Sequence, residues 1–292
     1  MTTSNYNTGF PNGVTIRNVP IVDLQNGNGK VFMVDSTIGS DSHKGTFRYP
    51  FASIRRALTF CVAGRGDKIL VATGHEEVID DDSYDIAVEN VQIFGLGVGK
   101  ERPRLELSGI AANHLKILRS NIYMGNIIVD INNSAAPTYA LLIDSPGVIL
   151  ENCSFMVTGT APTSVVALQT ISSIDNVSLI NCDFYINGSS NGIYIPYSGD
   201  NITIQDCSMF GTFANACIYN TAALTNLRLI RGSYSNFTAT KAAVSVHAST
   251  TGIAEDVRMN SDSLTTVFSA GSLRCNGCLG TAAAATAGTA IP

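Results

Sequence analysis

The second half of the chain repeats one short sequence pattern. It reads VILENCSF at 148–155, VSLINCDF at 177–184 and ITIQDCSM at 202–209, with a cysteine at the sixth position of each copy. A degenerate fourth copy follows at 227–234, with glycine in place of the cysteine. Successive sixth positions are 29, 25 and 25 residues apart. A repeat of this length indicates one supersecondary unit stacked on copies of itself, which is a solenoid.

The residue pattern within each copy is that of β-structure. Apolar and polar residues alternate with period two, as in a strand with one buried face. The alternation shifts phase near the Asn-Cys pair, so we expect a bend between two short strands there. Clusters of Gly, Ser, Asn and Asp between the copies, such as 187–192 and 197–201, are typical of turns. No copy contains a helix-length amphipathic run, and the sequence therefore predicts an all-β fold, a parallel β-helix.

The stacking also predicts what fills the core. Adjacent strands lie ~4.8 Å apart, so equivalent side chains of successive coils form ladders along the axis. Cys153, Cys182 and Cys207 would then lie above one another as a core ladder, because cysteine is small and apolar enough for a repeated inward position. We expect about seven to nine coils from the pattern.

The composition limits the classes of partner. Charged residues make up 14% of the chain, against roughly 25% in an ordinary soluble protein. Such a low charge fits a solenoid with Ser, Thr and Asn on its sides, or a surface buried against other subunits. The net charge is −5 with no basic block, so binding to nucleic acid has little support. No run of 18 apolar residues occurs, and we expect no membrane span.

We divide the chain into four segments. Residues 1–30 are polar and rich in Asn and Gly, and we interpret them as an extended N-terminal arm. Residues 31–66 hold a strand and a capping helix, residues 67–274 the parallel β-helix, and residues 275–292 a tail of small residues. The helix is predicted over 50–62, where apolar residues recur at three- and four-residue spacing. It would cover the open end of the solenoid, whose unpaired strand edges otherwise invite aggregation.

The cysteines and the N-terminal residues indicate in which cellular compartment the chain is made. The first ten residues have neither a basic start nor an apolar stretch, so we do not expect a signal peptide. The chain has seven cysteines, an odd number, and we expect free thiols made in a reducing compartment. Cys275 and Cys278 form a lone Cys-x-x-Cys, and a structural zinc site needs a second pair of ligands. We interpret this pair as a turn with two free thiols.

The sequence offers few candidates for catalysis. The densest acidic cluster is 80–85, with Glu76 and Glu77 nearby, and its acids are consecutive in what we interpret as a solvated loop. None of the four histidines has a partner at short spacing, and we find no acidic residues aligned on one face of adjacent coils. We therefore predict no catalytic, cofactor-binding or metal-ligating residues, no cofactor, and a chain that is not an enzyme.

The segment 34–74 resembles the start of pectate-lyase-like right-handed β-helix proteins. It contains VDSTIGSD at 34–41, KGTF at 44–47, PFASIRRAL at 50–58 and GDKILV at 66–71. In that superfamily, segments of this kind lead into the coils. The resemblance implies a right-handed, single-stranded parallel β-helix. It leaves the activity open, because the fold hosts lyases, hydrolases, phage tailspikes and inert structural proteins.

Residues 9–15, GFPNGVT, are similar to a short segment near the N-termini of tailed-phage virion proteins. This resemblance implies a structural virion protein of a tailed bacteriophage, a capsid decoration or cement protein made in the bacterial host cytoplasm. We expect a homotrimer whose arm docks on the phage major capsid protein or another virion protein. The docking residues that we expect are Phe10, Pro11, Val14, Ile16, Val19 and Ile21.

Two alternatives stay open. One is a tail fibre, tailspike or baseplate component, although the tail at 275–292 is short for a trimerising domain. The other is a polysaccharide lyase or a carbohydrate-binding β-helix, with a surface glycan as the partner. The absence of tryptophan lowers the support for the carbohydrate alternative, and Tyr194 and Tyr197 would be the first aromatic residues to test.

Overall fold

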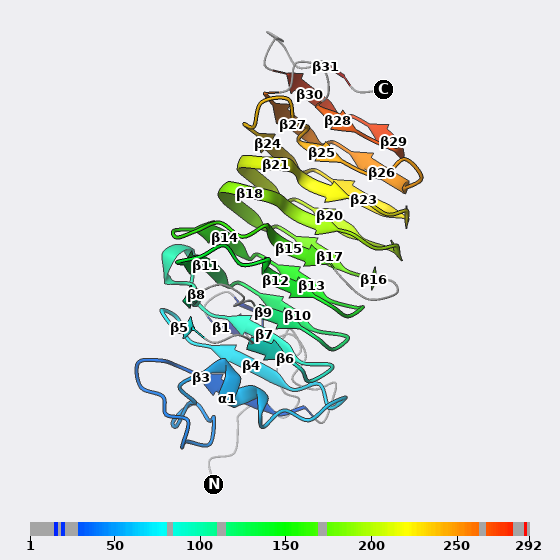
Figure 1. Ribbon diagram of the computed structural model, residues 1–292. Helices are drawn as coiled ribbons and strands as arrows, with labels where there is room; N and C mark the ends of the chain where they lie inside the picture. The colour runs from blue at the N-terminus through cyan, green and yellow to red at the C-terminus, as the bar shows by residue number, and fades with distance from the viewer. Residues whose placement is uncertain are drawn as a thin grey trace.

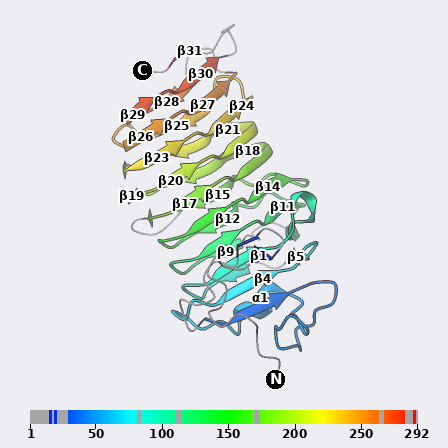
Figure 2. The ribbon, with the colours of Figure 1, turned by 180° about the vertical axis from the view of Figure 1, so that it is seen from behind.

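The chain coils into a right-handed parallel β-helix of about eight turns, as the sequence predicts. The computed structural model describes residues 15–16, 19–20, 29–80, 84–109, 115–168, 174–262, 267–282 and 289–290. Figure 1 shows the coils stacked in chain order, with α1 and β3 at one end and β29 and β30 at the other. Figure 2 shows the same stack from behind.

Three parallel β-faces run along the solenoid, and most coils contribute a strand to each of them. Sheet 1 consists of β3 (Val31–Val34), β4 (Lys68–Val71), β7 (Gln92–Gly95), β10 (Tyr123–Gly125), β13 (Ile149–Glu151), β17 (Ser178–Ile180), β20 (Thr203–Gln205), β23 (Leu227–Ile230), β26 (Thr251–Glu255) and β29 (Ser272–Asn276). Sheet 2 consists of β5 (Glu76–Ile79), β8 (Arg104–Gly109), β11 (Ile128–Asn133), β14 (Ser154–Val157), β18 (Asp183–Ile195), β21 (Ser208–Asn220), β24 (Ser233–Asn236), β27 (Arg258–Ser261) and β30 (Leu279–Ala282).

Sheet 3 continues from sheet 2 through the long strands β18 and β21. Its other strands are β6 (Tyr84–Ile86), β9 (Leu115–Ile117), β12 (Tyr139–Ile143), β15 (Ser164–Leu168), β25 (Val244–Ser245) and β28 (Phe268–Ser269). The remaining elements are short: β1 (Thr15–Ile16), β2 (Val19–Pro20), β16 (Ile174–Asp175), β19 (Gly199–Asp200), β22 (Leu224–Thr225), β31 (Thr289–Ala290), the helix α1 (Ile54–Leu58) and the 3-10 turn η1 (Gly99–Glu101).

The repeat copies lie in register, one above the other. Leu150 pairs with Leu179 in the next coil, and Leu179 with Ile204. The structure places Cys153, Cys182 and Cys207 in the core, all buried, and the Cys182 backbone N–H donates to the Cys207 sulfur at 3.5 Å. The core of each repeat coil is therefore built from the same sequence positions.

Asparagine makes many of the corners at the two ends of the sheet 1 strands. Asn152 and Asn181, just before the buried cysteines, have φ of 53° and 52°, the left-handed region that asparagine tolerates better than other side chains. The bend expected at the Asn-Cys pair is confirmed. The corner amides also bond between coils: Asn152 donates to Asn126 at 2.6 Å, and Asn226 to Asn201 at 2.6 Å on the opposite corner.

The degenerate fourth copy differs from the others by two linked replacements, which we call the paired replacement: glycine for the cysteine and tyrosine for the Phe or Met two positions later. Phe155, Phe184, Met209 and Tyr234 occupy one inward column, and in the fourth coil the column holds a tyrosine. The Tyr234 side chain is buried, and a Cβ added at Gly232 would lie 2.2 Å from its hydroxyl oxygen. The larger ring therefore fits only because the cysteine position has become glycine.

The helix is shorter than predicted. Phe51 forms a β-bridge with Val34 and is fully buried, so it belongs to an extended segment that precedes the helix. The helix itself covers Ile54–Leu58 and is capped by the Ser53 side chain, which accepts from the Arg56 N–H at 3.1 Å. Ile54 and Leu58 are buried, which closes the core at this end of the solenoid.

Much of the predicted arm lies outside the described residues, including Phe10, Pro11, Val14 and Ile21. Ile16 and Val19 are opposite each other in the antiparallel pair β1–β2. At the other end, the segment 275–292 contributes to β29, β30 and β31, so the final coil extends into the tail of small residues.

The paired replacement predicts a coupling between two positions. Gly232→Cys alone should lower the free energy of unfolding by about 1–3 kcal/mol, because the new side chain collides with the buried Tyr234 ring. Combining it with Tyr234→Met restores the arrangement of Cys207 and Met209 and should recover most of the loss. A double-mutant cycle by urea unfolding measures this coupling. If Gly232→Cys lowered the free energy of unfolding equally with tyrosine and with methionine at position 234, the predicted coupling would be wrong.

Candidate functional site

One outward-facing column of sheet 2 gathers the chemically distinctive side chains. The parallel register places one residue of each coil on it, because side chains of a strand alternate between the core and the surface. From the N-terminal to the C-terminal end, the column consists of Val78, Glu106, Asp130, Met156, Tyr185, Phe210, Ser235, Asn260 and Thr281.

The middle of this column is an exposed aromatic pair. Tyr185 and Phe210 are register partners on β18 and β21 and have exposed fractions of 59% and 57%. Phe237 packs edge-on against Phe210, with ring centroids 4.7 Å apart, and Met156 extends the apolar strip by one coil. Large apolar side chains left adjacent on a surface mark contact sites more often than single exposed ones do.

A shallow hollow begins where the aromatic pair ends. Its first part, of about 290 Å³, includes the next three members of the column. Its second part, of about 650 Å³, spreads to the corners between sheets 1 and 2. The lining residues of the first part are Ser233, Ser235, Arg258, Met259, Asn260, Leu279 and Thr281. Those of the second part are Arg231, Gly232, Ser233, Asp256, Arg258, Gly277 and Leu279.

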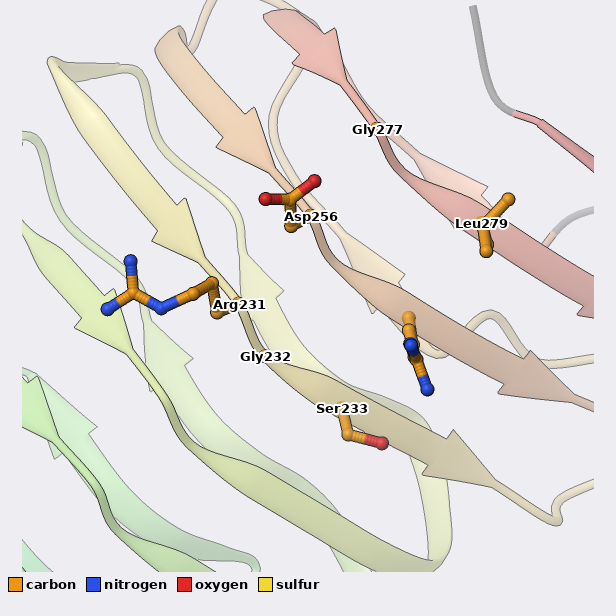
Figure 3. Close-up of a pocket in the computed structure, with 7 residues that line it drawn as sticks. Arg231, Gly232, Ser233, Asp256, Gly277 and Leu279 are labelled. Atoms are coloured by element: carbon orange, nitrogen blue, oxygen red, sulfur yellow. The ribbon is translucent and has the colours of Figure 1, made fainter.

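The hollow combines charged, hydroxyl and apolar groups. Figure 3 shows Arg231, Asp256 and Gly277 on successive coils, with Ser233 and Leu279 farther along their strands. Arg231 donates to both carboxylate oxygens of Asp206 at 2.7 Å, and this hydrogen bonding lowers the Asp206 pKa. The Arg258 side chain is exposed and lines both parts of the hollow.

A carboxylate pair occupies the N-terminal part of the same column. Glu106 and Asp130 are register partners on β8 and β11. Asp130 is buried, forms an ion pair with Arg104, and accepts from the Thr158 hydroxyl at 2.7 Å. The hydrogen bond to Asp130 raises the pKa of Arg104. Glu106 is partly exposed and accepts from the Asn132 amide at 2.8 Å.

This pair corrects the sequence analysis, which found no acids aligned on adjacent coils. The signal was present in the tripeptides Leu-Glu-Leu at 105–107 and Val-Asp-Ile at 129–131. In each, an acid stands between two residues that face the core, so the acid must face outward. The missing information was the register of the weaker upstream coils, which lack the Asn-Cys pair.

The histidine prediction was also wrong for His75. Its Nε2 lies 3.2 Å from Glu77 Oε2, and that carboxylate also accepts from the Ile54 N–H and the Tyr84 hydroxyl, both at 2.8 Å. Burial, followed by the charge of Glu77, raises the Tyr84 pKa well above its usual value. The group joins β5, β6 and the start of α1, and we interpret it as part of the cap.

The other sequence candidates are scattered. Of the acidic cluster predicted as a loop, Asp85 lies in β6 and 81–83 lie outside the described residues, while the nearby Glu76 and Glu77 lie in β5. Tyr194 is half-buried on sheet 3, where it stacks on Tyr219 with centroids 5.9 Å apart, and Tyr197 is in a separate turn.

Across the part of the chain that is described, no three His, Cys, Asp or Glu side chains are placed to hold a metal ion. Nor does that part contain a helix long and apolar enough to span a membrane.

Comparison with known proteins identifies solved structures of similar fold. No family model and no curated protein matches the chain. Among solved structures, a lacto-N-biosidase of family GH136 from Eubacterium ramulus matches with a TM-score of 0.53 and 13% identity, over 87% of this chain and 55% of that one. A rhamnogalacturonan lyase matches with a TM-score of 0.49 and 13% identity, over 80% of this chain and 70% of that one. This chain thus spans about half of the lacto-N-biosidase.

The match to the lacto-N-biosidase supports the pectate-lyase-like β-helix fold that the segment 34–74 implied. The prediction that the chain is not an enzyme is corrected, because the solved structure that shares its architecture is named as a GH136 lacto-N-biosidase. At 13% identity the likeness concerns the fold, so the activity has to be argued from the residues of this chain.

Proposed function

We propose that the protein binds a glycan chain along the outer face of sheet 2. The observation that carries the proposal is the exposed pair Tyr185–Phe210, which leads in register into the hollow around Arg258. Sugar rings have an apolar C–H face that packs on aromatic rings, and hydroxyl groups that bond to polar side chains. The column presents first the aromatic rings and then the polar side chains of the hollow.

The geometry favours a ligand that lies along the solenoid axis. Successive members of the column are about 4.8 Å apart, so an extended chain of rings meets a new side chain at each coil. The hollow supplies hydroxyl and amide groups from Ser233, Ser235 and Asn260, and the Arg258 guanidinium as a strong donor. The partly exposed Glu106 lies at the opposite end of the column.

The aromatic pair gives the first test. Tyr185→Ala and Phe210→Ala should each weaken glycan binding about 5- to 30-fold, equivalent to about 1–2 kcal/mol, because each removes one stacking surface. Binding is measured by calorimetry on a ligand selected from a panel of polysaccharides. Phe47→Ala is the matched control, since Phe47 is 61% exposed and lies before α1. Equal losses in all three variants, or no ligand in the panel, would contradict the proposal.

Glycan cleavage is a second candidate, favoured by the register of Glu106 and Asp130. Paired carboxylates on one face can supply an acid and a base or nucleophile for glycoside hydrolysis. Asp130 is held by Arg104 and Thr158, whereas Glu106 is the member of the pair that a ligand can reach.

We expect Glu106→Gln to lower the cleavage rate of a bound glycan at least about 100-fold while binding persists, because the amide cannot transfer the proton. Product release is followed by chromatography. Asp85→Asn serves as the control, since Asp85 is an exposed acid on β6 of sheet 3. A wild-type protein that binds but never cleaves would remove this candidate and leave the binding proposal intact.

The virion role stays a prediction from the sequence. Its support is the segment 9–15 and the length of arm before the solenoid, most of which lies outside the described residues. In this proposal the arm docks a homotrimer on the major capsid protein or another virion protein, and the outer face of sheet 2 stays open to surface glycans. A tail location is the alternative.

The copy number per purified phage particle tests that role by quantitative mass spectrometry against the major capsid protein. Decoration of the head lattice requires hundreds of copies, whereas a tail or baseplate position requires far fewer. Absence from particles would contradict the virion role without bearing on glycan binding.

A further inference from the structure

The last coil holds two cysteines that differ from the others in their surroundings. Cys275 lies in β29 and Cys278 immediately precedes β30, with Gly277 at the corner between them in the left-handed region, φ 66°. Cys275 is the register partner of Ala254, and the Cys278 sulfur donates to the Ala254 carbonyl at 3.3 Å. Cys275 and Cys278 therefore both lie next to Ala254 of the coil below.

The register shows why only this coil carries such a pair among the described residues. The inward column that ends at Cys275 is otherwise filled by Leu150, Leu179, Ile204, Leu229 and Ala254. The corner column that ends at Cys278 contains the core cysteines of the repeat. Only the last coil has cysteine in both columns, across one corner.

Access distinguishes Cys275 from every other cysteine except Cys61, which is also partly exposed but has no second cysteine near it in the sequence. Cys153, Cys182, Cys207 and Cys217 are all buried, so a solvent-borne reagent cannot reach them in the folded chain. Cys275 is partly exposed, while Cys278 is buried beside it. Burial, followed by the neighbouring Cys278, raises the pKa of the Cys275 thiol, so the exchange is favoured by mildly alkaline pH.

We propose that Cys275 and Cys278 form a reversible intracoil disulfide by exchange with a small-molecule disulfide such as oxidised glutathione. The Cys275 thiolate attacks one glutathione sulfur, which forms a mixed disulfide and releases one glutathione thiolate. The Cys278 thiolate then attacks the Cys275 sulfur and releases the second glutathione. The protein loses two protons and two electrons, and one oxidised glutathione becomes two reduced molecules.

The bond would act on the end of the solenoid. β29 is the terminal strand of sheet 1, and no described strand pairs with its outer edge. Terminal strands fray more readily than internal ones. Closing a ring across the Gly277 corner ties β29 to β30, so oxidation would hold the last coil together and reduction would release it.

The test uses the full-length folded protein, incubated with oxidised glutathione at mildly alkaline pH, then alkylated and mapped by peptide mass spectrometry. We expect the count of free thiols to fall by two from seven, with Cys275 joined to Cys278 in one peptide. Cys278→Ser should instead retain glutathione on Cys275, because the second exchange is lost. Cys61→Ser is the control and should still lose two thiols, since Cys61 follows α1 at the other end of the chain.

Hydrogen exchange provides a second measurement on the wild-type chain. Amides of β29 and β30 should exchange more slowly after oxidation than before, and amides of β13 and β17 should not change. Seven free thiols after incubation, or a mixed disulfide that persists on wild-type Cys275, would overturn the proposal. Closure of the bond without slower exchange at β29 would overturn its role at the end of the solenoid.

Discussion

The hydrogen bonding between successive coils is the interaction on which the rest of this structure depends. The N–H of Ser178 donates to the Val148 carbonyl at 2.9 Å, and the N–H of Thr203 to the Val177 carbonyl at 2.9 Å. A single coil buries little apolar surface and has no partner for its backbone groups. Each coil is therefore stable only on its neighbour, as in other repeat architectures.

This dependence makes register the main constraint on the sequence. A slip by one residue would turn the inward column outward. The corner asparagines oppose such a slip, because Asn152 and Asn181 must both adopt positive φ and their amides bond to each other at 3.2 Å. Where the repeat departs from its pattern, as at Gly232 and Tyr234, the departure is compensated within the same coil.

The same register that aligns the core also aligns the surface. Tyr185 and Phe210 come together because their neighbours Phe184 and Met209 are stacked in the core. Glu106 and Asp130 come together for the same reason on β8 and β11. A solenoid thus builds a binding face from residues some 25 positions apart without any loop to hold them. Surface positions tolerate substitution well, so new chemistry can be introduced there at little cost to folding.

The two ends of the solenoid core finish in different ways. At the N-terminal end, α1 covers the core, and Glu77 accepts hydrogen bonds that link the helix to β5 and β6. At the C-terminal end, the core column finishes with the partly exposed Cys275. The thiol pair lies at the end of the solenoid opposite the helix cap, where β29 is the terminal strand of sheet 1.

The sequence by itself determined the β-helix, the length of its coils and the bend at the Asn-Cys pair, because period-two alternation and left-handed corners are local properties of the chain. Only the tertiary structure decided which outward residues of different coils are neighbours. Glu106 and Asp130, or Tyr185 and Phe210, are unremarkable in isolation, since each is one polar or aromatic residue in an alternating strand. Their pairing depends on the register between coils, which core packing and interstrand hydrogen bonds set between residues 24 or 25 positions apart in the sequence.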